Sequence, residues 1–74
     1  MPHRVDIALG ERIKEIRRNL DMSQTDMANQ IGVSFQQVQK YEIATNRVSV
    51  SRLVMIAGAL GCTASDLMRG MEDV

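Results

Sequence analysis

Aromatic residues are nearly absent from this chain: Phe35 and Tyr41 are the only two among 74 residues, and there is no tryptophan. The core must therefore be built from aliphatic side chains and from the six methionines, whose flexible thioethers fill irregular spaces. Cysteine is equally scarce. The single thiol, Cys62, excludes an intrachain disulfide and a metal site made of several cysteines, and we interpret it as a small buried apolar side chain.

Long apolar runs and catalytic groups are also lacking. No segment approaches the roughly 20 apolar residues of a membrane-spanning helix, and residues 1–9 lack the apolar run of a signal peptide. We therefore expect a cytoplasmic protein without a membrane partner. The only histidine, His3, is expected to be exposed to solvent. Because no nucleophile–base pair or metal-ligand cluster is visible, the sequence predicts no enzyme, no cofactor, no metal and no small-molecule ligand.

Excess charge of either sign is missing too, because nine basic residues balance nine acidic ones. The charges are nevertheless segregated along the chain. Residues 34–52 contain three basic residues and one acidic residue, whereas residues 66–74 contain three acidic residues and one basic residue. A basic middle segment is compatible with DNA binding through one face, but the overall balance predicts modest sequence-independent affinity.

What the sequence does contain is helical periodicity in five segments, without the alternation of a strand. The predicted helices cover about 7–20, 24–30, 35–43, 50–60 and 64–69. Each follows a residue suited to cap a helix N-terminus; in order, these are Asp6, Ser23, Ser34, Ser49 and Thr63. We predict one all-α domain over residues 7–70, preceded by a flexible N-terminus at 1–6 and followed by a short acidic tail at 71–74.

Apolar stripes on these helices predict the core. On the first helix the stripe consists of Leu9, Ile13, Ile16 and Leu20. On the fourth helix the residues expected to face inward are Val50, Leu53, Ile56, Ala57 and Leu60.

The second and third predicted helices, with the turn between them, form a helix-turn-helix unit over residues 24–43. Gly32 lies in the turn, where a positive φ is cheap only for glycine. Ala28 is small at the point where the two helices must approach closely. The remaining inward positions of the unit are apolar, namely Met27, Ile31, Val33 and Val38.

This chain resembles the large family of phage repressor, Cro and Xre-type bacterial regulators. The resemblance extends from about Leu9 to Leu67 and is carried by the stretches 9–13, 22–24, 31–34, 41–42 and 53–66. It implies a five-helix, lambda-repressor-like domain in which helices 2 and 3 form the helix-turn-helix and the third helix enters the major groove. It also implies a transcriptional repressor that binds a near-palindromic operator in double-stranded DNA as a homodimer, in association with the nucleoid.

The third predicted helix carries the candidate base contacts. At about 100° per residue, Gln36 and Lys40 point about 160° away from the inward direction of Val38. Glutamine can pair with adenine, and lysine can donate to guanine. The predicted base-contacting residues are Phe35, Gln36, Gln37, Gln39 and Lys40. The alternative is that the polar ones are merely solvated, and Phe35 either packs against helix 2 or meets a thymine methyl group.

Helix starts and the loop after the third helix supply the candidate phosphate contacts, because free N–H groups at a helix start and arginine side chains both favour phosphate. The predicted set is Gln24, Ser34, Asn46, Arg47, Ser49 and Arg52. Ser49 can cap its helix as well, and Arg52 either reaches the DNA strand or is only solvated. The loop departs from the family at Ala44, where many relatives have glycine, and at Val48, where many have proline. Because alanine resists positive φ, we expect the end of the third helix to differ here.

Two further predictions concern assembly of the fold. Glu42 lies only about 40° from Val38 on the wheel, and a carboxylate there is costly unless it is paired. Arg17 follows the core residue Ile16, and the family commonly joins an arginine and a glutamate at these positions. We therefore predict a buried ion pair between Arg17 and Glu42, the alternative being that Glu42 reaches solvent. The predicted dimer interface is the end formed by helices 4 and 5, around Leu60, Cys62, Leu67 and Met68.

A second functional hypothesis is an antitoxin-like or other protein-interaction module whose DNA binding is secondary. The acidic tail from Met68 to Val74 would then contact a protein partner.

Overall fold

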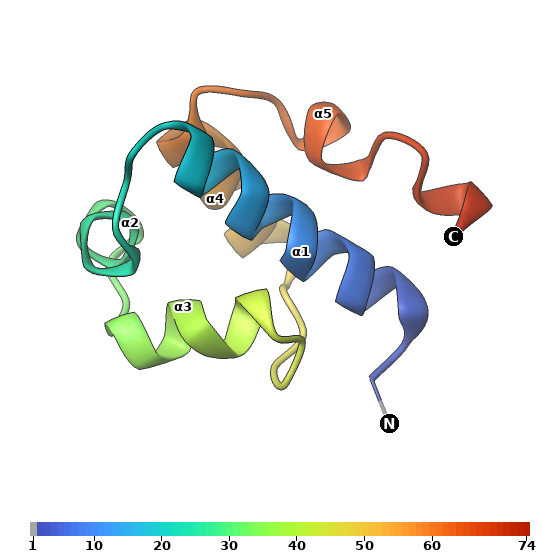
Figure 1. The fold of residues 1–74 in the computed structure, drawn as a ribbon, viewed down its shortest axis with the longest axis horizontal. Helices are drawn as coiled ribbons and strands as arrows, with labels where there is room; N and C mark the ends of the chain where they lie inside the picture. Colours follow the sequence, from blue (N-terminus) through green and yellow to red (C-terminus); the bar gives the residue numbers. More distant parts are fainter. Residues whose placement is uncertain (1) are drawn as a thin grey trace.

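In the computed structural model, which describes residues 2–74, five α-helices pack around one core (Figure 1). They are α1 (Arg4–Asn19), α2 (Gln24–Ile31), α3 (Phe35–Glu42), α4 (Val50–Leu60) and α5 (Ala64–Met68), and a 3-10 turn follows at Met71–Asp73. The described residues contain no strand, so the predicted all-α class is confirmed. No single helix in this part of the chain has the length and apolarity to span a membrane; α4 and the segment 64–73 reach them only as a pair bent by 106°.

Side-chain caps fix where the last four helices begin. The side chains of Ser23, Ser34, Ser49 and Thr63 each accept a hydrogen bond from the backbone N–H three residues later. Such a cap satisfies one of the donors that a helix N-terminus leaves without a partner. At α5 the bond is reciprocated, because the N–H of Thr63 donates to Asp66, which lowers the pKa of that carboxyl.

The first helix begins earlier than the sequence predicted. It begins at Arg4, and its cap is His3, whose Nδ1 accepts from the Val5 N–H at 3.0 Å; the predicted cap, Asp6, lies in the first turn instead. Residues 4–6, predicted to precede the first helix, therefore belong to it, while Met1 lies outside the described residues. A neutral imidazole nitrogen can cap in the same way as a carboxylate, which is the signal that the prediction overlooked.

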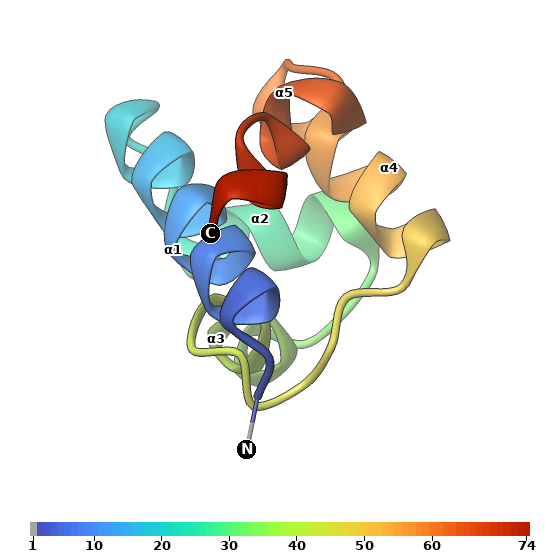
Figure 2. The same ribbon diagram turned by 90° about the vertical axis from the view of Figure 1, so that its right-hand side faces the viewer.

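The core draws on every helix. Its largest fully buried side chains are Ile13, Met27, Ile31, Val38, Ile56 and Leu67. Two residues predicted to face inward do not: Leu20 is 51% exposed because α1 ends before it, and Val50 is 79% exposed in the first turn of α4. In Figure 2 that turn projects away from the other helices. Conversely, Met71 in the predicted tail is buried against the core.

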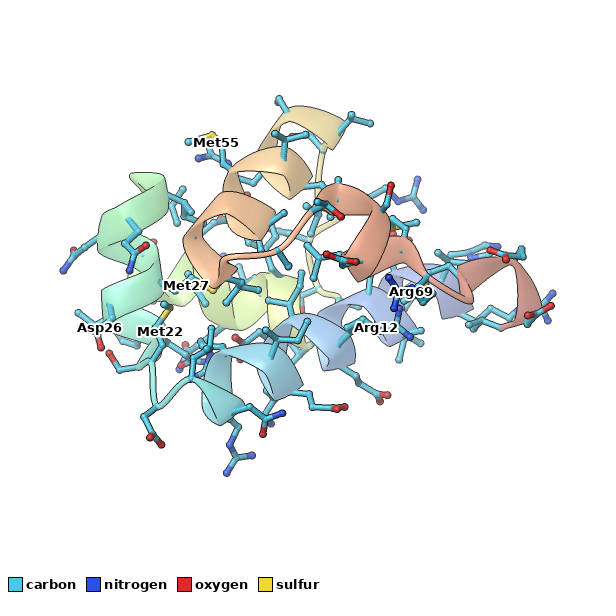
Figure 3. All side chains as sticks on the ribbon, turned by 90° about the horizontal axis from the view of Figure 1, so that it is seen from above. Arg12, Met22, Asp26, Met27, Met55 and Arg69 are labelled. Carbon is cyan, nitrogen blue, oxygen red and sulfur yellow. The ribbon has the colours of Figure 1, made fainter. Side chains whose placement is uncertain are left out.

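The C-terminal segment is fastened to α1 by an arginine. Arg12 Nη1 donates to the carbonyl oxygen of Leu67 at 3.1 Å and also to that of Arg69. Figure 3 shows the Arg12 side chain reaching toward Arg69. These carbonyls lie at the end of α5, where a helix leaves its last acceptors without partners. The backbone up to Arg69 is thus held against α1, and of the predicted tail Met71 is buried whereas Glu72, Asp73 and Val74 are exposed.

Helix α3 lies across α1 at very short range. A Cβ placed on Gly10 of α1 would be 2.6 Å from the carbonyl oxygens of both Tyr41 and Glu42. Only glycine permits this approach. Just beyond, Ala44 adopts φ 61° and is 6% exposed, so alanine takes the left-handed conformation that we expected it to resist. Its burial and the bond from Thr45 N–H to Lys40 O at 2.9 Å offset the cost, which is about 1–2 kcal/mol.

A buried ion pair joins the same two helices. Arg17 Nε lies 2.6 Å from Glu42 Oε2, and Arg17 Nη2 donates to Oε1 at 3.1 Å. Gln24 Nε2 donates to Oε1 at 3.0 Å, and Arg17 Nη1 donates to Met22 O at 2.7 Å. The two charged side chains are 9% and 1% exposed. Among the described residues no buried side-chain nitrogen or oxygen lacks a partner, so this network is fully satisfied.

Breaking this pair from one side should unfold much of the population. Glu42→Ala strands the Arg17 guanidinium, and removal of one member of a buried pair costs about 3–5 kcal/mol. Arg17→Met should be similarly costly, whereas the double variant should lose less than the sum because no charge is left alone. Thermal and urea unfolding measure all three variants. Two nearly silent single variants would contradict the structural role of the pair.

The close approach at Gly10 gives a matched pair of alanine variants. Gly10→Ala should destabilise the fold by about 1–3 kcal/mol, because backbone must move to admit the methyl group. Gly58 is the control: it is also inside a helix, but nothing lies within 4 Å of its Cβ position. Gly58→Ala should therefore stabilise by about 0.5–1 kcal/mol. Equal effects of the two substitutions on the urea midpoint would refute the proposed close contact.

Candidate nucleic-acid interface

The turn between α2 and α3 has the geometry of a helix-turn-helix. Gly32 ends α2 with φ 73°, and the N–H of Val33 donates to Ala28 O at 3.0 Å. Ala28 is 2% exposed, and Ser34 starts the next helix two residues after the glycine. The chain therefore changes direction within three residues, and α3 runs at a large angle to α2 (Figure 1).

The outer face of α3 is polar and exposed. Gln36 and Lys40 lie on it opposite the fully buried Val38, and the exposed Gln39 flanks it. No hydrogen bond to another residue among positions 2–74 engages these three side chains, so their donors and acceptors face solvent. Long amides and an amine in this position match the hydrogen-bonding groups at base edges in the major groove.

The other two predicted base contacts have different surroundings. Phe35 is 42% exposed at the start of α3, so part of its ring is available to a ligand. Gln37 is half-buried, and its Oε1 accepts from Asn46 Nδ2 at 3.3 Å. Gln37 and Asn46 thus fasten the following loop to α3. The sequence analysis did not predict this contact. The two residues are only nine positions apart, and the chain between them runs from α3 into the loop that folds back on it.

Several predicted phosphate contacts are already engaged within the chain. Ser34 and Ser49 cap their own helices, and Gln24 donates to Glu42. Arg52 Nη1 donates to Ile31 O at 2.7 Å and so binds the C-terminal end of α2. The sequence analysis expected Arg52 either to reach the DNA strand or to be solvated. It could not predict this bond to Ile31, because the bond depends on how α4 packs against α2.

Arg47 is a candidate phosphate donor whose side chain is largely exposed. It lies in the loop between α3 and α4, and its side chain is 75% exposed. Its Nε donates to Asp6 Oδ2 at 3.1 Å, across from the first turn of α1. The pair borders an open hollow of about 550 Å³, lined by Pro2, Asp6, Ile43, Ala44, Thr45 and Arg47. Figure 1 shows this loop and α3 along the same lower edge of the molecule.

Two of the four residues predicted for a dimer interface are in the core of the single chain. Leu60 is 4% and Leu67 0% exposed, so their side chains cannot face a second copy. The prediction chose them for their apolar character and did not distinguish helix positions that face the core from those that face solvent. Cys62 and Met68 are half-buried. Burial raises the pKa of the Cys62 thiol, and the nearby Asp66 carboxylate adds to that shift, so the thiol stays neutral.

An apolar surface that the sequence analysis overlooked lies on the outside of α4. Val54 is 57% and Met55 46% exposed, and Gly58 continues the same face without a side chain. Figure 3 shows Met55 at the periphery of the molecule. At about 100° per residue, Met55 and Gly58 lie opposite Leu60. We call Val54, Met55, Gly58 and Cys62 the outer α4 face; none of the four is charged, and the guanidinium of Arg52 borders them, with Nη1 3.7 Å from Met55 Sδ.

Comparison with known proteins agrees with this geometry. The sequence pattern of the helix-turn-helix family matches residues 13–67. A transcriptional regulator in the ATPase CF(0) region of Rhodospirillum rubrum is 49% identical over 72 residues, covering 92% of this chain and 67% of the relative. An HTH-type transcriptional regulator of Sinorhizobium fredii is 48% identical over 69 residues, covering 93% of this chain and 48% of the relative. The chain thus spans about two thirds and about half of these two proteins.

Solved structures show the same fold. The DNA-binding domain of the P22 c2 repressor superposes with a TM-score of 0.80 at 27% identity, covering 84% of this chain and 82% of that one. The restriction-modification controller protein C.AhdI of Aeromonas hydrophila gives a TM-score of 0.80 at 26% identity, covering 82% of this chain and 92% of that one. The chain therefore belongs to the helix-turn-helix family of DNA-binding transcriptional regulators, the group that contains the phage repressors, and not to a class of enzymes.

Proposed function

We propose that this protein is a transcriptional repressor that acts in the cytoplasm, on the nucleoid, as a homodimer bound to a near-palindromic operator. The observation that carries the proposal is the outer face of α3, where Gln36, Gln39 and Lys40 are exposed and unpaired on a helix held rigidly by its neighbours. A P22 c2 repressor structure that contains a synthetic operator superposes on this chain with a TM-score of 0.76 at 27% identity.

In this proposal α3 lies in the major groove and the loop at residues 43–49 follows the phosphate backbone. Gln36 and Lys40 read base edges, with Gln39 beside them and Phe35 against a thymine methyl group. Arg47 binds phosphate through its free Nη groups, and the N-termini of α2 and α4 offer backbone N–H groups to neighbouring phosphates. Gln24, Ser34 and Ser49 support these helix starts.

A second copy is needed because one eight-residue helix contacts few base pairs. Twofold dimers of this class read half-sites about 34–36 Å apart, one turn of DNA. The molecule measures 31 × 25 × 22 Å, which is on the scale of one such turn of DNA. The outer α4 face is the surface that we assign to the contact, since its four residues are uncharged and two of them, Val54 and Met55, are exposed apolar side chains.

The second hypothesis, a protein-interaction module, remains a proposal: Met71 is buried, but Glu72 and Asp73 beside it are exposed. A gel-shift titration against genomic fragments at several salt concentrations separates the two functions. We expect one or few fragments to shift at low protein concentration, with salt-sensitive affinity. No shift at any sequence, together with co-purification of a second protein, would favour the interaction module.

Base readout should depend on two surface side chains. On the best-bound fragment, Gln36→Ala and Lys40→Ala should each lose about 1–3 kcal/mol of discrimination. Their melting temperatures should barely move, because both residues are exposed. Lys14→Ala on α1 removes the same charge as Lys40→Ala and serves as the control. If Gln36→Ala and Lys40→Ala discriminate between sequences as well as the parent and the Lys14→Ala control do, α3 does not read the bases in this way.

Dimer formation should depend on the outer α4 face. Val54→Glu places a charge in the contact and should convert the complex from two copies per DNA duplex to one, as measured by analytical ultracentrifugation. Leu20→Glu is the matched control, because Leu20 is 51% exposed just after the end of α1 and lies outside the contact. Half-site centres should lie about 10 base pairs apart. Saturation of the parent as a monomer on its best site would refute the dimer.

A further inference from the structure

We propose that Asp6 is a positioning residue that orients Arg47 toward the DNA backbone and makes binding more selective for the operator. The inference rests on the proposed function, since it concerns how the loop after α3 binds phosphate. It starts from the ion pair that joins the first turn of α1 to that loop, Arg47 Nε to Asp6 Oδ2 at 3.1 Å.

The two side chains of the pair are unequally exposed. That of Asp6 is 20% exposed and that of Arg47 is 75% exposed. The carboxylate is therefore fixed against the domain, in the first turn of a helix whose N-terminus favours negative charge. The guanidinium lies over it and projects into solvent beside the open hollow at Thr45. Asp6 is thus the less exposed member that holds the pair in place, and Arg47 is the member that is accessible to a ligand.

Only one of the arginine's nitrogens is used. The guanidinium is planar, with its N–H donors in a rigid fork, so a bond at Nε fixes the plane. One N–H of Nη2 lies on the Asp6 side with Nε–H, and the N–H groups of Nη1 and the other N–H of Nη2 are directed away from Asp6. Within residues 2–74 these Nη groups have no other hydrogen-bond partner. A phosphate can be bound through them without breaking the bond to Asp6. An ordered side chain loses less entropy on binding than a free one, which favours the aligned complex.

The backbone beneath Arg47 is also fixed, so the orientation is defined relative to α3. The N–H groups of Thr45 and Asn46 both donate to Lys40 O, at 2.9 and 3.3 Å, and Asn46 Nδ2 donates to Gln37 Oε1. A phosphate contact from Arg47 is therefore kept in register with the base contacts of α3. Such a contact stabilises the complex with the operator, because only there are the phosphate contact and the base contacts of α3 made together.

The charge of Asp6 acts in the opposite direction on sequence-independent binding. A carboxylate beside Arg47 offsets the attraction that any phosphate would feel, and sequence-independent affinity depends on that attraction. The chain as a whole is neutral, which already weakens such binding. Asp6 thus supports operator binding through geometry while it lowers binding to other DNA through charge.

The sign of the effect of Asp6→Ala tests the inference. Affinity is measured for the best-bound fragment and for a scrambled duplex of equal length, at three salt concentrations. Removing a negative charge alone would strengthen binding to both. We expect instead that operator affinity falls about threefold, the scale of an exposed ion pair, while scrambled-duplex affinity rises. Asp6→Asn keeps an oxygen acceptor for Nε and should retain most of the selectivity.

Two controls isolate the route through Arg47. Glu11→Ala removes the same charge from the exposed surface of α1 and should leave the selectivity ratio unchanged. In an Arg47→Ala background, Asp6→Ala should also leave that ratio unchanged. All affinities are measured below the unfolding temperature of each variant. These outcomes together would support a positioning role that a merely structural pair would not have.

Two results would overturn the inference and leave the proposed function intact. One is that Asp6→Ala strengthens both complexes equally, as a change of charge alone would do. The other is that Asp6→Ala lowers the ratio just as much when Arg47 is already alanine. If the parent binds no duplex in a salt-sensitive manner, the proposed function itself fails, and the inference fails with it.

Discussion

The buried carboxylate of Glu42 is the point on which the geometry of this domain depends. It lies at the end of α3, 1% exposed at the side chain, and receives hydrogen bonds from Arg17 of α1 and Gln24 of α2. Arg17 also donates to Met22 O in the segment that joins those two helices. A charge so deeply buried is tolerable only while every partner stays in place. The network therefore fixes the angle of α3 against both of its neighbours, which aliphatic packing alone would specify less sharply.

The backbone around this carboxylate follows from the same constraint. For Glu42 to reach Arg17, the end of α3 must lie directly on α1, and Gly10 provides the room. The chain must then turn away at once, which Ala44 does at φ 61°. The loop that results carries Asn46 and Arg47 beside the exposed face of α3, and it is fastened there by Gln37 and Asp6. The buried ion pair and the exposed polar residues of α3 and its following loop are thus connected through the same short stretch of backbone.

Sequence reasoning succeeded where the cause is local. The caps Ser23, Ser34, Ser49 and Thr63 act within one turn, and the wheel position of Glu42 is a property of α3 alone. It failed where two distant segments meet. The need for glycine at position 10, the capping of α2 by Arg52 and the bond between Asp6 and Arg47 depend on tertiary approach. Leu60 and Leu67 were assigned to an interface because apolar character does not distinguish a core position from a contact surface.

The central claim is that α3, held by the Glu42 network, reads base edges in one half of a twofold site. The most direct test is selection of bound sequences from a random pool of DNA duplexes by the purified chain. The account predicts enrichment of one short motif in two inverted copies, with centres about 10 base pairs apart. Recovery of sequences without a shared motif, or of a single motif without its inverted partner, would contradict it.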